Sequence, residues 1–465
     1  MKTCSRRLRR GLVLSAVLGI AAFGPAQPAF AAAPEFEPPP LTPATPPGGP
    51  LTPLGGYEPT QGCMQPNTSG ASVEEKPWSQ RALGFEQAHE QGLTGAGETV
   101  AVIDTGVNPH PRLKLNGGGG SSVPDGGANS DCDGHGTVVA GIIGASQDPN
   151  TGFVGVAPDA TIMSIRQSSA NFQNRAENKT IGNTETMAQA IQHAANSNVD
   201  VINISQASCQ PMAQALADAG GYNNELYNAV KNAYDKGIVI VAAAGNTQDS
   251  CQKNPSGAPT TAVLPAWFDK YVLTVASTGQ QGQPSEFTVP GPWVDVAAPG
   301  ENLTSLDPGR GGSTVVNQLA EGNQNQPGPI QGTSFAAPYV SGLATLIKQK
   351  HPELSAGEIM QRIEDTSISP GGPNGRNDIV GYGMVDPMAA LDDVIPAEHG
   401  KPAAPVRPAR LGSNVVPQPD WPAISIAFGG TVCGVGAVLF TAFLVRARKV
   451  AAAQRAGVDP DDEEF

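Results

Sequence analysis

The middle of the chain alternates short apolar runs with amphipathic segments, and this alternation limits the possible folds more than any other feature. Six runs have the composition of strands: 99–103, 161–165, 200–204, 238–243, 272–276 and 294–296. Five segments have helical periodicity: 135–144, 186–196, 225–235, 334–349 and 357–364. Such alternation predicts an α/β domain with a mostly parallel central sheet and helices on both of its faces.

Two polar stretches interrupt this pattern. Residues 167–183 and 307–331 are rich in turn residues and show neither a helical nor a strand period, so we expect both to be surface loops. The second loop leads directly into Gly332, and we expect it to border any cleft there. Either it contacts a substrate or partner, or it is a tolerated surface insertion.

Three short motifs carry the groups that nucleophilic acyl transfer needs. The segment VIDTG at 102–106 offers a carboxylate, DGHGT at 133–137 an imidazole, and GTSFAAP at 332–338 a hydroxyl. Serine is a weak nucleophile until a base takes its proton, and a carboxylate that fixes the tautomer of the base completes the arrangement. We therefore predict catalytic roles for Asp104, His135 and Ser334.

The positions of these residues agree with the predicted fold. Reactive groups of parallel α/β sheets lie at the carboxyl ends of strands, where Asp104 closes the first predicted strand and Asn246 follows the fourth. Ser334 begins a predicted helix, so backbone N–H groups and the positive end of the helix dipole lie beside its hydroxyl. The N–H of Ser334 is therefore a candidate donor to an oxyanion.

These motifs, in the order Asp, His, Ser and with AAGN at 243–246 between them, resemble those of the subtilisin-like serine proteases (subtilases). The resemblance covers roughly residues 78–391. It implies a three-layer subtilisin-like fold, peptide-bond hydrolysis through an acyl-enzyme, and an oxyanion hole formed by Asn246 and Ser334. We expect no cofactor, and no metal either, because the acidic residues around Cys132 lack the spacing of a calcium loop.

The same resemblance implies a substrate-binding strand and a pocket for the residue before the scissile bond. The residues concerned are Ser205, Gln206, Ala207, Ala243, Ala244 and Gly245. The family more often has glycine at the position of Ala207. The added methyl group favours a narrow pocket and a small substrate side chain, such as that of alanine.

Both ends of the chain have targeting patterns. Residues 1–33 combine basic residues, an apolar run and a small-residue cleavage site, which predicts a secretory signal peptide rather than an uncleaved anchor. Residues 423–445 are apolar or small throughout, enough for a helix across a bilayer of about 30 Å. Because Arg446, Arg448 and Lys449 follow, we predict one transmembrane helix, an extracytoplasmic peptidase domain and a cytoplasmic tail, residues 446–465.

The segment between the signal peptide and the peptidase domain is too short and too polar to fold as a domain of its own. We therefore expect residues 34–77 to be a Pro-rich N-terminal arm that lies on the peptidase domain, residues 78–395. A second Pro-rich stretch, residues 396–422, would act as a semi-rigid linker to the membrane.

Six cysteines are present, of which Cys4 falls in the signal peptide and Cys433 in the predicted span. The other four enter an oxidising compartment and allow three pairings. We favour Cys63–Cys132, which ties the arm near His135, and Cys209–Cys251, which flanks two loops at one side of the sheet. A metal site is the competing interpretation, but no Cys-x-x-Cys spacing supports it.

This order of segments resembles that of the mycosins, the membrane-anchored subtilases of actinobacterial type VII secretion systems. The resemblance implies protein substrates that are secreted and an association with the secretion membrane complex. Two alternatives stay open: a general degradative surface subtilase, and a scaffold of the complex whose proteolysis is dispensable. The formal net charge of −14 disfavours nucleic acid and anionic lipid as partners.

Overall fold

The computed structural model describes residues 48–67, 75–218, 222–248, 250–319, 327–371, 375–395, 398 and 421–456. The chain divides into two compact units, Met1–Glu398 and His399–Phe465. The predicted signal peptide and residues 396–397 and 399–420 of the predicted linker lie outside the described residues.

A parallel sheet forms the centre of the first unit. In the described part of the chain it has seven strands, in the order β12-β11-β9-β7-β2-β4-β3. They are β2 (Thr99–Asp104), β3 (Lys114–Asn116), β4 (Thr161–Arg166), β7 (Val201–Ile204), β9 (Val239–Ala243), β11 (Leu273–Thr278) and β12 (Val296–Pro299). The inner strands are apolar on both faces because helices cover both sides of a parallel sheet. The predicted α/β sheet is confirmed.

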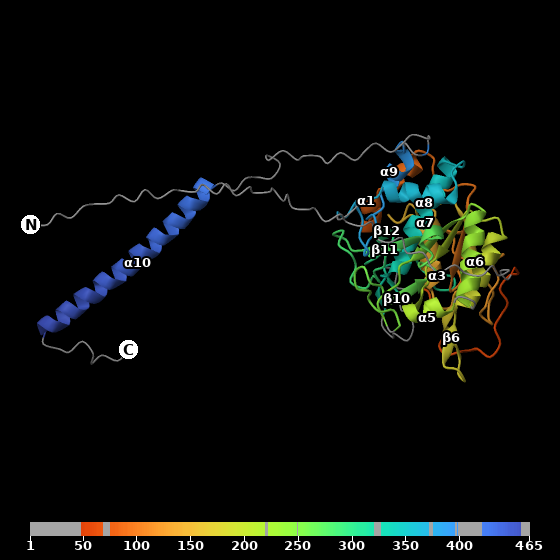
Figure 1. Ribbon diagram of the computed structural model, residues 1–465, viewed down its shortest axis with the longest axis horizontal. Helices are drawn as coiled ribbons and strands as arrows, with labels where there is room; N and C mark the ends of the chain where they lie inside the picture. The colour runs from red at the N-terminus through yellow and green to blue at the C-terminus, as the bar shows by residue number, and fades with distance from the viewer. Residues whose placement is uncertain are drawn as a thin grey trace, which may run out of the picture. The chain divides into compact units, whose positions relative to one another are not determined.

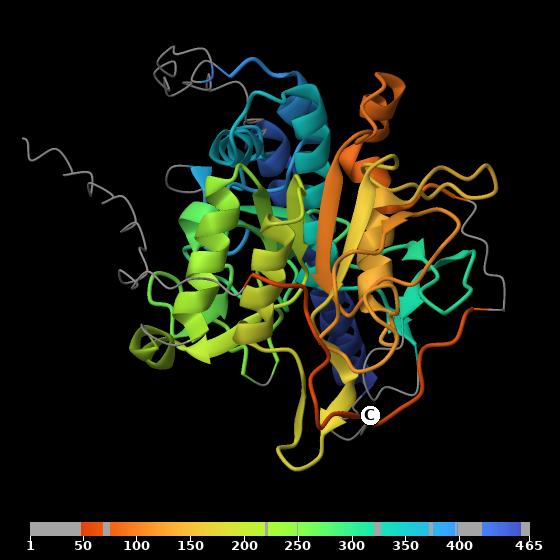
Figure 2. The same ribbon diagram turned by 90° about the vertical axis from the view of Figure 1, so that its right-hand side faces the viewer.

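Helices lie on both faces of this sheet (Figure 1 and Figure 2). The longer ones are α3 (His135–Gly144), α4 (Thr184–Ala195), α6 (Tyr222–Asp235), α7 (Thr333–Lys350) and α8 (Ala356–Asp365). On β2, Val100 and Val102 pack in one cluster with α3 and α7, whereas Ala101 and Ile103 pack in another with α4 and α6. Since successive side chains of a strand point to opposite faces, the unit has the predicted three layers.

Several short elements were not predicted from the sequence. They are α1 (Trp78–Leu83), α2 (Glu86–Glu90), β8 (Ser208–Pro211), α5 (Met212–Ala217), β10 (Thr261–Leu264), a 3₁₀ turn (Asp269–Tyr271) and α9 (Pro387–Asp392). Among them β8 and β10 form an antiparallel pair. Elements of three to six residues are too short to show a clear period.

The first polar insertion contains a hairpin, so the expectation of an irregular loop is wrong. Strands β5 (Ser169–Asn174) and β6 (Lys179–Ile181) pair antiparallel, with a shift of register between Ser169 and Gln173. Strand β5 also pairs with β1 (Glu58–Pro59) in the N-terminal arm. The shift breaks the alternation that would reveal a strand, and β1 is far away in sequence.

The second polar insertion also contains strands, which corrects the same expectation. Strand β14 (Val315–Val316) of the insertion pairs with β13 (Ser305–Leu306), which directly precedes the insertion, and β15 (Gln318–Leu319) pairs with β16 (Gly328–Pro329) within it. Residues 320–326 lie outside the described residues. Strands of two residues leave no recognisable pattern in a sequence.

Residues 48–67 of the arm lie along the peptidase domain. Leu51 is buried, the N–H of Leu54 donates to the Ser122 carbonyl at 2.8 Å, and the N–H of Met64 donates to the Cys132 carbonyl at 3.0 Å. Beyond these backbone contacts, a disulfide fastens the arm to the domain.

The structure contains both of the favoured disulfides. Cys63 pairs with Cys132 and Cys209 with Cys251, with Cα–Cα distances of 4.2 and 5.1 Å. The predicted pairing is therefore confirmed. The first bridge joins the arm to the residue three positions before His135, and the second links β8 to the loop after β9.

The second unit contains the helix α10 (Trp421–Ala456). Among the residues that the structure describes, no helix is both long enough and apolar enough to cross a membrane. The side chains of residues 421–433, which include the first part of the predicted span, lie outside that description.

Candidate active site

The three predicted catalytic residues come from the ends of three packed elements. Asp104 is the last residue of β2 and is fully buried. His135 is the first residue of α3, and Ser334 is the second residue of α7. Helices α3 and α7 pack against each other on one face of the sheet, so these distant segments meet at one point.

A continuous chain of hydrogen bonds joins the three side chains. His135 Nδ1 lies 2.8 Å from Asp104 Oδ1, and His135 Nε2 lies 3.0 Å from Ser334 Oγ. When Nδ1–H donates to the carboxylate, the lone pair of Nε2 can accept the proton of the serine. The imidazole also packs on Phe335, with ring centroids 4.7 Å apart. The arrangement has the geometry of a nucleophile, a base and an orienting carboxylate.

A proline in α7 shapes the backbone at Ser334. Pro338 has no N–H, so it cannot pair with the carbonyl of Ser334 one helical turn earlier. The hydroxyl of Ser205, just past β7, donates to that carbonyl at 2.6 Å, and Asn203 Nδ2 donates to Ser205 Oγ at 2.9 Å. Ser205, expected from the sequence to bind substrate, thus holds the backbone of the candidate nucleophile.

Asn246 and Ser334 border a common space beside Gly332. The backbone N–H and the hydroxyl of Thr333 both donate to Asn246 Oδ1, at 3.0 Å each, which turns Asn246 Nδ2 away from Thr333. A Cβ built on Gly332 would lie 3.0 Å from Ser334 Oγ and 3.1 Å from Asn246 Nδ2. An oxygen in this space would lie within hydrogen-bonding distance of Asn246 Nδ2 and next to Ser334 Oγ, the atom that would bond to the substrate carbon. The role of Thr333 was not predicted from the sequence.

The expected pocket residues lie at the ends of two adjacent parallel strands. Strand β7 runs into residues 205–207, and β9 runs into residues 243–245. The Cβ of Ala207 lies 3.7 Å from the place where a Cβ on Gly245 would stand, so the two segments are in contact distance. The side chain of Gln206 donates to the Ser168 hydroxyl and so extends toward the first insertion.

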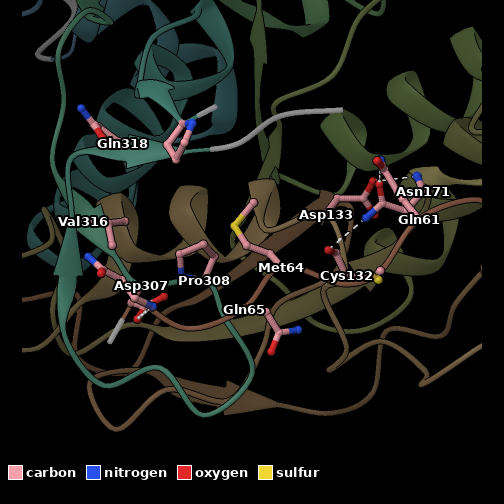
Figure 3. A pocket seen from close by; sticks show the side chains of 13 residues that line it. Gln61, Met64, Gln65, Cys132, Asp133, Asn171, Asp307, Pro308, Val316 and Gln318 are labelled. Carbon is pink, nitrogen blue, oxygen red and sulfur yellow. Dashed lines mark hydrogen bonds between the residues drawn. The ribbon is translucent and has the colours of Figure 1, made fainter. Parts of the chain in front are cut away.

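A cavity of about 470 Å³ lies beside the His135 motif (Figure 3). The arm contributes Met64 to its wall and the second insertion contributes Pro308, and Figure 3 shows these two side chains next to each other. A Cβ built on Gly134 would lie 2.7 Å from Met64 Sδ and 3.1 Å from Pro308 Cγ. The arm and the insertion therefore reach the residue that precedes His135, and the insertion borders the site as expected.

Comparison with known proteins agrees with this geometry. The model of the subtilase family (Peptidase_S8) matches residues 95–383. Mycosin-1 of Mycobacterium tuberculosis is 42% identical over 433 residues, covering 86% of this chain and 93% of that protein.

Solved structures show the same relationship. The crystal structure of MycP1 from Mycobacterium smegmatis has a TM-score of 0.70 and 40% identity, covering 80% of this chain and 98% of that chain. A chain in the structure of an intact ESX-5 inner membrane complex has a TM-score of 0.70 and 37% identity, covering 88% of this chain and 100% of that chain. This chain therefore belongs to the subtilase family of serine proteases, which are hydrolases, and within it to the mycosins.

Proposed function

We propose that the protein is a serine endopeptidase in which Asp104, His135 and Ser334 form the catalytic triad. The unbroken hydrogen-bond chain from Asp104 through His135 to Ser334 carries this proposal. His135 takes the proton as Ser334 attacks the peptide carbonyl, and it later gives this proton to the leaving amine. Asp104 holds the ring and stabilises the imidazolium while an acyl-enzyme forms on Ser334 and is hydrolysed.

Asn246 and Ser334 supply the oxyanion hole in this proposal. Asn246 Nδ2 and the N–H of Ser334 donate to the oxygen of the tetrahedral intermediate in the space beside Gly332. Thr333 fixes the amide of Asn246 through its two hydrogen bonds to Oδ1, so the donor is oriented before substrate arrives. Pre-oriented donors of this kind stabilise the transition state more than the ground state.

The substrates we propose are protein segments with a small residue before the scissile bond. Ala207 supports this choice, because its methyl group projects toward Gly245 between the two segments that would form the pocket. Residues 205–207 and 243–245 would bind the substrate chain on this side of Ser334.

We also assign the enzyme to the outer face of a membrane. The signal-peptide pattern of residues 1–33 and the apolar segment 423–445, followed by basic residues, support one C-terminal transmembrane helix and an extracytoplasmic peptidase domain. The structural relative within an ESX-5 inner membrane complex supports association with a type VII secretion complex.

The same relative favours a second function, stabilisation of the secretion complex apart from proteolysis. Secretion by cells that carry Ser334→Ala, compared with cells that lack the gene, distinguishes the two functions. Normal secretion with Ser334→Ala and none after deletion would assign the essential role to the scaffold.

A fluorophosphonate probe tests the catalytic proposal on the full-length chain. The probe reacts with a serine that a neighbouring base has activated. We expect labelling of the parent chain and none of Ser334→Ala or His135→Ala. Equal labelling of the parent and His135→Ala would refute the assigned base.

A further inference from the structure

A second buried carboxylate, that of Asp131, lies behind the Asp104–His135 pair. Its Oδ1 accepts hydrogen bonds from the Thr105 hydroxyl at 2.9 Å and the Gly134 N–H at 2.7 Å. Its Oδ2 accepts from the N–H and the hydroxyl of Thr137, at 2.8 and 2.7 Å. Each oxygen thus faces two donors, an arrangement that fits an ionised carboxylate, which only accepts.

These donors belong to the two segments that hold the triad. Thr105 follows Asp104, whereas Gly134 precedes His135 and Thr137 lies two residues after it. The Thr105 hydroxyl also accepts the N–H of Gly136 at 3.0 Å. The side chains of Asp131 and Thr105 therefore satisfy N–H groups in the first turn of α3, where His135 is the first residue. A negative charge is favourable at this end of a helix.

Asn108 fixes Asp131 itself. The N–H of Asp131 donates to Asn108 Oδ1 at 3.0 Å, and Asn108 Nδ2 donates back to the Asp131 carbonyl at 2.7 Å. The N–H of Asn108 in turn donates to the Thr137 hydroxyl at 2.9 Å. The carboxylate is thus held rigidly between the end of β2 and the start of α3.

We infer that Asp131 is a positioning residue of this enzyme: its ionised carboxylate locks the Asp104 segment to the His135 segment and so fixes the distance between acid and base. The inference rests on the proposed triad and adds a fourth residue to it. Asp131 reaches the reacting atoms only through Thr105, Gly134 and Thr137.

Electrostatics give this lock a pH dependence. Burial raises the pKa of Asp131 to about 6, with a smaller contribution from Asp133, while the hydrogen bonds of Thr137 and Gly134 oppose the rise. Below that pH a proton on the carboxyl would face a donor and displace it, which loosens the start of α3. The charged or titratable groups around Asp131 are Asp104, Asp133, His135, Arg166 and, through Ser130, Arg310.

The first test compares Asp131→Asn with Asp295→Asn in the full-length chain. An amide at 131 replaces one acceptor with donors that oppose the donors of Thr137 or Gly134. Asp295 is a matched control, since it is also buried, its pKa is also raised by burial, and it accepts the Thr274 N–H at 2.7 Å, away from the triad segments.

The measured quantity is the rate of fluorophosphonate labelling, divided by the amount of protein that is labelled at the end of the reaction. Protein that has not folded is never labelled, so it does not affect this rate. A misplacement of about 1 Å costs on the order of 100-fold, and we expect Asp131→Asn to label roughly 10- to 100-fold more slowly. Asp295→Asn should label at nearly the parent rate. Labelling of Asp131→Asn at the parent rate, or an equal loss in Asp295→Asn, would overturn the inference.

The pH profile separates positioning from a merely structural role. In the parent chain, protonation of either His135 or Asp131 at low pH slows labelling. A plot of the logarithm of the labelling rate against pH should therefore have a slope that approaches two on the acid side. In Asp131→Asn the slope should be one. An unchanged slope would contradict the lock, whereas labelling of Ser334→Ala would instead refute the triad on which the inference rests.

Thr105 provides a second test if Asp131→Asn does not fold. Thr105→Val keeps the volume but removes the hydroxyl that joins Asp131 to the N–H of Gly136, and Thr105→Ser keeps that hydroxyl. We expect about a tenfold slower labelling for the valine variant and recovery for the serine variant. Equal rates for the two variants would count against the inference.

Discussion

Gly332→Ala tests the proposed oxyanion site through a single added carbon. The new Cβ would lie 3.0 Å from Ser334 Oγ and 3.1 Å from Asn246 Nδ2. Donors of an oxyanion hole lie about 2.7–3.1 Å from the oxygen that they stabilise, and Asn246 Nδ2 is such a donor in the proposed site, so the methyl group would occupy the space that we assign to this oxygen. The substitution should block the reaction without removing any group of the proposed triad.

The expected loss is at least that of one oxyanion-hole donor, about 10²- to 10³-fold in kcat. That range was measured on a subtilisin, another member of the same family, rather than on this chain. Gly332 also has φ +149°, a conformation that alanine rarely adopts, so we expect some loss of stability besides. A residue other than glycine in this region of backbone conformation costs of the order of 1–3 kcal/mol.

Gly237→Ala is the matched control. Gly237 has φ +79°, and a Cβ added there would meet no atom within 4 Å. This variant therefore has a strained backbone, but its added methyl group contacts nothing. The assay is the second-order rate of fluorophosphonate labelling, together with thermal unfolding of both variants. Both should unfold at lower temperature, and only Gly332→Ala should label slowly. Labelling of Gly332→Ala within a few-fold of the parent rate would refute the placement of the oxyanion.

The remaining predictions concern the arm, the pocket and pH. The Cys63–Cys132 disulfide closes a loop with a sequence separation of 69, so its removal in the double variant Cys63→Ser/Cys132→Ser should lower the free energy of unfolding by up to about 4 kcal/mol. An unchanged midpoint of urea unfolding would contradict this. Ala207→Gly should widen the pocket and raise kcat/KM several-fold for peptides with a larger residue before the cut; an unchanged profile in a peptide library would count against the assigned wall. Burial raises the pKa of Glu364 to about 7, so the stabilising protonated form of this residue is complete below about pH 4 and is lost as pH rises through 7. Urea unfolding should therefore give a larger free energy at pH 5 than at pH 8, and the reverse order would be inconsistent with this shift.

Much of the fold was visible in the sequence because the central strands are buried on both faces. Runs such as 238–243 contain little except apolar residues, and the motif residues Asp104 and His135 adjoin such elements directly. The disulfides could be favoured because four cysteines of the predicted exported part leave only three pairings.

The hairpin β5–β6 could not be predicted in this way. Its strands are polar and surface-exposed in part, they shift register, and one partner is the short β1 of the arm. Pairing of this kind depends on contacts between distant segments, whereas a sequence pattern reports local periodicity.

Residues that support the site were missed for the same reason. Thr333 fixes Asn246, and Asp131 joins β2 to α3, but only through hydrogen bonds between segments that the fold brings together. Pro338 was one available signal. A proline four residues after Ser334 leaves the Ser334 carbonyl without its helical partner, which calls for a donor from elsewhere, here Ser205.

The position of the nucleophile and of the oxyanion can be seen together in the structure of the full-length chain after reaction with a fluorophosphonate. We expect a phosphorus–oxygen bond to Ser334 Oγ, with the phosphonyl oxygen in the space beside Gly332, about 2.7–3.1 Å from Asn246 Nδ2 and from the N–H of Ser334. An adduct on another serine, or a phosphonyl oxygen directed away from Asn246, would contradict it.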